Sequence, residues 1–201
     1  MEERVNKDMA GLAAAIDYDA ELMLRVKDGD NASFGLLLEK HRSPVIHFLY
    51  RMVQNQAVAE ELAQEVFLRV FRSRGSYERT AKFTTWLFRI ATHLALNSLR
   101  DHRHERQQES LDLEIDDQPV RQVSDRRPTV EQSMVYQARL GEVREAIATL
   151  PEKQRVAVLM HKFEEMEYSQ IAKALNCSES AVKSLLFRAY ETLRARLAHM
   201  A

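Results

Sequence analysis

One stretch of the sequence, residues 105–134, divides the chain and limits what it can fold into. It carries eight acidic side chains against four basic ones, contains Pro119 and Pro128, and shows no sustained apolar repeat of helical or strand period. A segment of this composition cannot bury enough apolar surface to form a core. Because structureless loops of this length are uncommon inside compact domains, we interpret it as a flexible acidic linker between two domains. A solvated loop within one domain is the alternative.

The charge of the chain follows the same division. The whole chain has a net charge of −1, which by itself argues against nucleic acid. By segment, residues 1–19 carry −3, 20–104 carry +4, 105–134 carry −4 and 135–201 carry +2. We therefore expect two basic domains, at 20–104 and 135–201, preceded by an acidic tail at 1–19 to which we assign no role.

Both expected domains have the apolar repeat of helices. Val58, Leu62 and Val66 recur every four residues, which predicts an amphipathic helix over 57–72. Asp19 is expected to cap a helix that begins at the next residue. That helix is expected to end at residue 27, and Asn31 is expected to cap the next one, which runs to about residue 53. The further expected helices span 84–104, 130–149, 152–163, 167–175 and 179–199. Five glycines and four prolines are too few for a turn-rich β fold, so the predicted class is all-α.

The C-terminal segment has the spacing of a helix-turn-helix. Ile171 faces the core, Asn176 can adopt the left-handed turn conformation, and Ser178 can cap the second helix. Cys177 is expected to be buried in this core. Such a hairpin can be purely structural, but its second helix would also present a face to a DNA major groove. The candidate DNA-binding residues are Ser178, Glu179, Ser180, Lys183, Ser184, Phe187 and Arg188.

A basic segment with interleaved aromatic residues lies in the first expected domain. Residues 72–106 carry eight Arg or Lys against three acidic side chains. Basic groups that follow a backbone, with aromatic rings that stack on unpaired bases, are typical of single-stranded nucleic acid binding. Trp86 can instead belong to the apolar core stripe with Ile90 and Leu94. The candidate residues are Tyr77, Lys82, Phe83, Trp86, Arg89, Asn97, Arg100 and Arg103.

Nothing in the sequence indicates an enzyme or a metal site. A single cysteine excludes a cysteine-rich zinc site and an internal disulfide, no helix carries a His-Glu-x-x-His motif, and the five glycines are isolated. The apolar run at 9–16 is too short to cross a membrane. We expect a cytoplasmic protein without cofactor, bound metal, catalysis or membrane insertion.

Five ordered motifs resemble one protein family. They are 59–71 (AEELAQEVFLRVF), 83–97 (FTTWLFRIATHLALN), 150–155 (LPEKQR), 168–172 (YSQIA) and 181–189 (AVKSLLFRA). Their order and spacing are similar to those of the extracytoplasmic-function sigma factors of bacterial RNA polymerase. The resemblance covers about residues 20–104 and 131–198.

The resemblance implies a division of roles between the two domains. The first domain would bind core RNA polymerase and capture the melted minus-ten promoter element. The second would recognise the minus-thirty-five element as duplex through Lys183, Ser184, Phe187 and Arg188. Loop 75–83 resembles the loop that holds a flipped-out base. The residues that resemble the core-binding surface are Glu61, Gln64, Glu65 and Arg69.

The resemblance also implies an anti-sigma factor as a regulatory partner, although no residue identifies one. Two other functions remain open from the residues alone. The first is a helix-turn-helix regulator that binds duplex DNA without core polymerase, and the second is a helical interaction adaptor. The polar face at 61–69 and the basic segment at 72–106 favour the sigma factor, because neither alternative needs them.

Overall fold

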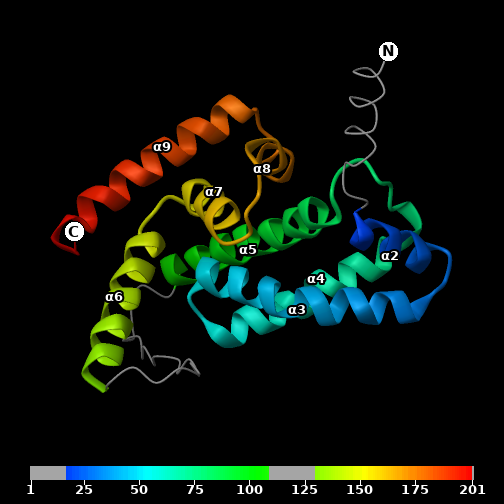
Figure 1. Ribbon diagram of the computed structural model, residues 1–201, viewed down its shortest axis with the longest axis horizontal. Helices are drawn as coiled ribbons and strands as arrows, with labels where there is room; N and C mark the ends of the chain where they lie inside the picture. The colour runs from blue at the N-terminus through cyan, green and yellow to red at the C-terminus, as the bar shows by residue number, and fades with distance from the viewer. Residues whose placement is uncertain (1–16, 109–129, 201) are drawn as a thin grey trace, which may run out of the picture.

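The computed structural model describes residues 17–108 and 130–200, and the regular elements in these ranges are helices. The predicted all-α class is confirmed. The first half contains α2 (Tyr18–Lys27), α3 (Asn31–Val53), α4 (Gln56–Arg72), η1 (Arg74–Ser76) and α5 (Phe83–Gln108). The second half contains α6 (Val130–Ala148), α7 (Glu152–Lys162), α8 (Tyr168–Leu175), α9 (Glu179–Arg196) and η2 (Ala198–Met200). We call α2–α5 the N-terminal unit and α6–α9 the C-terminal unit (Figure 1).

Two aspartates organise the start of the N-terminal unit. Asp17 caps α2, because its carboxylate accepts a first-turn backbone N–H at 3.3 Å, and it also accepts the Phe83 N–H at 2.6 Å. This residue therefore joins the starts of α2 and α5. The prediction that Asp19 is the cap was wrong. Asp19 is buried, and its carboxylate accepts from Lys40 Nζ at 2.7 Å and lies 2.9 Å from His41 Nε2, as a buried charge requires.

The apolar faces of α3, α4 and α5 meet in the core of the N-terminal unit. Phe48 of α3 contacts Phe88 of α5 edge-on, with 5.2 Å between ring centroids. Val66 and Val70 of α4, from the predicted apolar stripe, are fully buried. Burial of each such side chain stabilises the fold by roughly 1.5–3 kcal/mol. This packing fixes the outward faces of α4 and α5, on which the candidate residues lie.

The hairpin of α8 and α9 has the predicted local geometry. Asn176 ends α8 in the left-handed conformation, with φ 51° and ψ 54°, and Ser178 Oγ accepts the Ala181 N–H at 3.1 Å. Val182 faces the core. Cys177, however, is exposed, so the prediction that it is buried was wrong. It lies in the turn between the left-handed residue and the helix cap, and this turn directs its side chain to solvent.

The two units pack against each other. In the C-terminal unit, α8 lies against α5, and both α6 and α7 contact α3 (Figure 1). Buried apolar residues of both units form one continuous cluster. The composition of the linker did not predict this contact, and residues 109–129 of the linker lie outside the described part of the chain. Within residues 17–108 and 130–200, no helix is both long and apolar enough to span a membrane.

Candidate nucleic-acid and polymerase interfaces

The outward face of α9 gathers the candidate residues of the helix-turn-helix. Val182, Leu186 and Ala189 hold the helix on its core, so the residues between them point to solvent. The ring of Phe187 is 67 % exposed. All seven candidates lie on the surface: Ser178, Glu179, Ser180, Lys183, Ser184, Phe187 and Arg188. The helix therefore presents two cations and an aromatic ring on one side.

The polar groups of this face are only partly engaged within the protein. Ser184 Oγ donates to the Ser180 carbonyl at 3.1 Å, which leaves its oxygen free to accept a further hydrogen bond. Lys183 and Arg188 form no ion pair with a described residue. Exposed cations that form no ion pair within the protein can bind phosphates or the acceptor edge of guanine. The face is thus chemically suited to a duplex groove.

On α5, the basic candidates lie outside and the aromatic candidates lie within. Arg89 and Arg100 are exposed and Asn97 is half-buried. The exposed Arg103 donates through Nη2 to Glu152 Oε1 of α7 at 2.5 Å, so this candidate is engaged by the C-terminal unit. Lys82 is exposed at the end of the loop before α5. The helix therefore carries a basic surface that could follow a strand backbone.

The aromatic candidates Tyr77 and Phe83 do not present a stacking surface. Both rings are buried, and they pack with the half-buried Trp86 at centroid distances of 4.9 Å and 5.9 Å, respectively. Burial raises the pKa of Tyr77 to about 12. The expectation that these two rings hold an unpaired base therefore requires correction, because both are used to pack the loop onto α5. Trp86 is the aromatic candidate that keeps partial access to solvent.

The loop before α5 is held in place by contacts with α2. Lys27 Nζ donates to the Tyr77 carbonyl at 2.9 Å, and Arg79 Nη1 donates to Glu21 Oε1 at 2.5 Å. Because the two bonds join residues 50 and 58 positions apart in sequence, the position of the loop depends on tertiary structure. The exposed Glu78 lies between the anchored residues Tyr77 and Arg79, and the exposed Thr80 follows them.

The polar face predicted on α4 is present in the structure. Glu61, Gln64 and Arg69 are exposed and Glu65 is half-buried. Arg69 Nε donates to Glu65 Oε1 at 2.7 Å, an ion pair one helical turn apart. Such an exposed pair contributes only about 0.3–0.5 kcal/mol to stability. These side chains therefore remain available to a partner.

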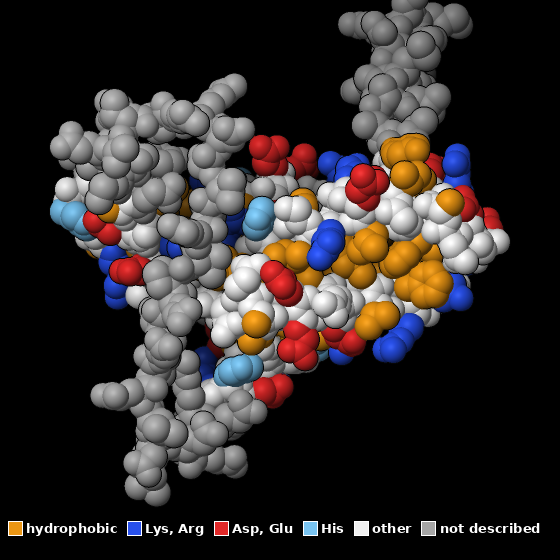
Figure 2. All heavy atoms as spheres, turned by 90° about the horizontal axis from the view of Figure 1, so that it is seen from below, with side chains coloured by type: hydrophobic (Ala, Val, Ile, Leu, Met, Phe, Trp, Pro, Cys, Tyr) orange, Lys and Arg blue, Asp and Glu red, His pale blue; other side chains and the backbone are white. Residues whose placement is uncertain are grey.

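An apolar groove beside this polar face was missed by the sequence analysis. It has a volume of about 670 Å³ between α3 and α4, and Phe34, Phe67, Leu68 and Phe71 are among the residues that line it. Figure 2 shows hydrophobic side chains gathered on the face seen from below. Leu68 is 49 % exposed although it lies next to Arg69. A leucine among the polar positions of α4 was the available signal.

Models of two protein families match the two units of the chain. The model of sigma-70 region 2 matches residues 37–105, and the model of sigma-70 region 4 matches residues 140–193. The first match contains α4, the loop and most of α5. The second contains the hairpin of α8 and α9. Each of the candidate surfaces therefore lies within one of the matched regions.

Individual proteins of this kind are similar over nearly the whole chain. RNA polymerase sigma factor CarQ of Myxococcus xanthus is 32% identical over 178 residues, which cover 89% of this chain and 97% of that protein. The ECF RNA polymerase sigma factor SigW of Bacillus subtilis is 28% identical, over 86% of this chain and 93% of that protein. The fold is similar to that of the sigma factor RpoE in its complex with the anti-sigma factor NepR from Bartonella quintana. That match has a TM-score of 0.67 at 19% identity, over 82% of this chain and 96% of that one.

The fold, its surfaces and these similarities define a class of protein: the chain belongs to the sigma factors of bacterial RNA polymerase. Within that class it is a sigma factor of the extracytoplasmic-function type, as its motifs predicted. It binds core RNA polymerase, directs it to promoters and starts transcription. Proteins of this family are transcription initiation factors and not enzymes.

Proposed function

We propose that this sigma factor divides promoter recognition between its two units, with 20–104 as the region 2 domain and 135–201 as the region 4 domain. The C-terminal unit would recognise the minus-thirty-five element through α9. The exposed cations Lys183 and Arg188 support this role, because their surroundings leave both free to contact phosphates or base edges. Ser178, Glu179, Ser180, Ser184 and Phe187 would complete the contact surface.

The N-terminal unit would capture the melted minus-ten element on α5 and the loop before it. Arg89, Arg100 and Lys82 would follow the strand backbone, while Trp86 and Asn97 would contact bases. Flipping a base out of the duplex costs a few kcal/mol, which preformed contacts must offset. The packing of Tyr77 and Phe83 under Trp86 supports such preformation. We propose that these two rings support the loop instead of stacking on a base.

Core polymerase would bind the outward side of α4. Glu61, Gln64, Glu65 and Arg69 would supply polar contacts, and the groove that contains Leu68 would supply apolar area. Interfaces of this kind combine a buried apolar centre with a polar rim. The continuity between the groove and the polar face supports one shared binding surface.

The observation that carries the proposal is the presence, in one unit, of the α4 surface and the basic side of α5. A helix-turn-helix regulator without core polymerase, or an interaction adaptor, would need neither. The test combines the purified protein with core polymerase on a promoter library and sequences the transcripts. The expected result is initiation from a defined promoter class. Duplex binding without any dependence on core would favour the regulator instead.

We also propose that the protein acts in the cytoplasm, where core polymerase and promoters are found, under the control of an anti-sigma factor. The similarity in fold to a sigma factor solved with NepR, and to CnrH solved with the cytosolic domain of CnrY, motivates the regulatory part. Co-purification from the native cell would test it, and recovery with core polymerase alone under every condition would contradict it.

A further inference from the structure

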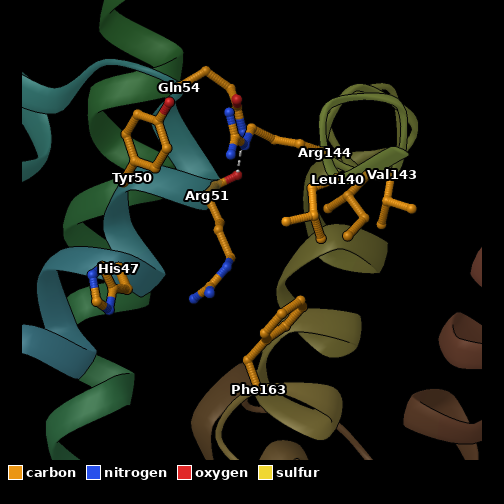
Figure 3. A pocket seen from close by; sticks show the side chains of 9 residues that line it. His47, Tyr50, Arg51, Gln54, Leu140, Val143, Arg144 and Phe163 are labelled. Carbon is orange, nitrogen blue, oxygen red and sulfur yellow. Dashed lines mark hydrogen bonds between the residues drawn. The ribbon is translucent and has the colours of Figure 1, made fainter. Parts of the chain in front are cut away.

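A small hollow lies where the end of α3 meets α6 and the residue that follows α7 (Figure 3). It has a volume of about 250 Å³. One of its walls is apolar and comes from α6, with Leu140, Val143 and Ile147. Figure 3 shows Arg51 of α3 pointing into this space toward the ring of Phe163. The hollow therefore combines an apolar wall, an aromatic ring and a cation.

A second cation borders the same hollow. Arg144 of α6 lies over the ring of Tyr50 at 5.8 Å, and Arg51 lies over the ring of Phe163 at 4.1 Å. Neither arginine forms an ion pair with a described residue. A ring face attracts a guanidinium, but only an acceptor such as a carboxylate can take its N–H donors in pairs. Both cations can therefore bind an anion as a further partner.

The surroundings of Arg51 make an anion favourable there. The residue is half-buried, and burial lowers the pKa of its guanidinium, with the like charge of Arg144 acting in the same direction. Glu164 is the nearby carboxyl that could neutralise it, but burial raises the pKa of Glu164 to about 7. At neutral pH this carboxyl is therefore ionised only about half of the time. A partly buried cation whose counter-ion is incomplete gains from binding an anion.

We propose that this hollow binds a small planar anion of the aromatic carboxylate class. The carboxylate would lie between Arg51 and Arg144, and the planar body would pack against the apolar wall of α6 and the ring of Phe163. The hollow is smaller than the roughly 300–1,000 Å³ typical of sites for drug-sized molecules, which limits the body to a small ring system. No lining residue belongs to the surfaces proposed for DNA or core polymerase, so the inference does not depend on the proposed function.

The lining requires both parts of such a molecule. Arginine binds carboxylates through paired N–H donors and also stacks on planar groups. An inorganic anion would neutralise the two cations but leave the apolar wall against water. A neutral aromatic molecule would cover the wall but leave the cations without a counter-ion. A planar anion satisfies the wall and the cations together.

The probe for this site is naphthoate, an aromatic carboxylate. Naphthamide is its neutral counterpart, and inorganic phosphate is an anion without an apolar body. Isothermal titration of the full chain should show that naphthoate binds about tenfold more tightly than either of the other two compounds. No binding of naphthoate, or equal binding of naphthoate and naphthamide, would overturn the proposal. Equal binding of phosphate would overturn it too, because the apolar wall would then play no part.

Two arginine variants test which groups recognise the carboxylate. Arg51→Gln and Arg144→Gln each remove one cation and keep a polar side chain. Each should weaken naphthoate binding about tenfold and leave naphthamide binding unchanged, a split that general damage to the fold would not produce. Arg139→Gln, at an exposed position of α6 outside the hollow, is the matched control and should change neither. Unchanged naphthoate affinity in both arginine variants would overturn the proposal.

The neighbouring carboxyl provides a test in the opposite direction. At pH 8 Glu164 is mostly ionised, because its pKa is about 7, and its charge competes with the bound carboxylate for Arg51. Glu164→Gln should therefore tighten naphthoate binding about two- to threefold at this pH and leave naphthamide binding unchanged. Glu165→Gln, at the exposed next position, is the control. Unchanged or weaker naphthoate binding in a folded Glu164→Gln, with helix content checked by circular dichroism, would overturn the proposal.

Discussion

The faces of α9 and α5 are both proposed to contact promoter DNA, yet the structure builds them in opposite ways. On α9 the core residues and the candidate residues are separate sets, and Phe187 is 67 % exposed. On α5 the aromatic candidates are part of the core: Phe83 is fully buried and packs with Trp86 and Tyr77. The basic candidates Arg89 and Arg100 are exposed there, whereas Arg103 pairs with Glu152.

This difference corresponds to the state of the DNA that each face would bind. A duplex groove already has its shape, so a helix needs only to present side chains to it. An unpaired strand has no fixed shape, so the protein must supply a rigid surface for it. Substitutions on the exposed face of α9 should therefore change DNA binding alone. Substitutions of the buried aromatic residues at the start of α5 should change stability as well.

The largest expected effect is on stability, from Phe83→Ala. Removing a fully buried ring from the core of the N-terminal unit should lower the free energy of unfolding by about 3–5 kcal/mol. Phe187→Ala removes the same side chain from an exposed site and should change it by less than about 0.5 kcal/mol. Urea unfolding followed by circular dichroism measures both. Equal losses in the two variants would remove the contrast between the faces.

The next effect is on minus-thirty-five binding. Lys183→Ala and Arg188→Ala should each weaken binding to duplex promoter DNA by roughly 1–3 kcal/mol if the side chain contacts a base, with unfolding unchanged. Arg194→Ala, six residues beyond Arg188 on α9, is the control and should have a smaller effect. The affinity is measured by titrating labelled duplex promoter DNA with the complex of core polymerase and each variant, in which the C-terminal unit is accessible. Unchanged affinity in both variants would remove these residues from the interface.

The same contrast explains which features the sequence could predict. The left-handed Asn176 and the Ser178 cap depend on a few neighbouring residues, so local rules identify them. The exposure of the α9 face follows from helical periodicity. The burial of Phe83 depends on tertiary packing with α2 and α3, including His41 at 5.4 Å between ring centroids, which no local pattern records.

The wrong predictions have the same cause. The sequence around Asp19 is typical of a helix cap. In the structure, however, its buried carboxylate contacts Lys40 and His41 of α3, and Asp17 caps α2 instead. The groove beside α4 is lined by residues of both α3 and α4, so the pattern of α4 alone could not predict it. The contact between the units joins residues that are 103 positions apart, as in the bond from Arg155 to Met52, and the linker composition pointed away from it.

A third prediction extends the contrast to core binding on α4, where an exposed polar face adjoins a groove. Glu65→Arg breaks the pair with Arg69 and reverses one charge, and we expect it to weaken core polymerase binding by about 1–2 kcal/mol. Leu68→Asp should do the same by placing a charge in the apolar groove. Glu39→Arg, an exposed reversal on α3, is the control. If both variants still bind core polymerase normally in a pull-down, this surface is not the core-binding surface.

The smallest expected effect is a dependence of stability on pH. It arises in the loop between α7 and α8, which precedes the DNA-binding hairpin. Burial raises the pKa of Glu164 to about 7, and the nearby Arg51 opposes the rise. Between the ordinary value of 4.5 and about 7, the folded state therefore binds more protons than the unfolded state, so this group makes stability fall as pH rises through that window.

Glu164→Gln removes this titration. It should leave the free energy of unfolding nearly unchanged at pH 4 and raise it by about 1 kcal/mol at pH 8, a value reduced for the partial exposure of the site. Urea unfolding across this pH range measures the effect, with the exposed neighbour Glu165→Gln as the control. Because Glu164 lies outside the α9 face, duplex binding should not change. A loss of duplex affinity would show that the hairpin transmits changes at its base to α9, and the two DNA faces would then differ less than their burial indicates.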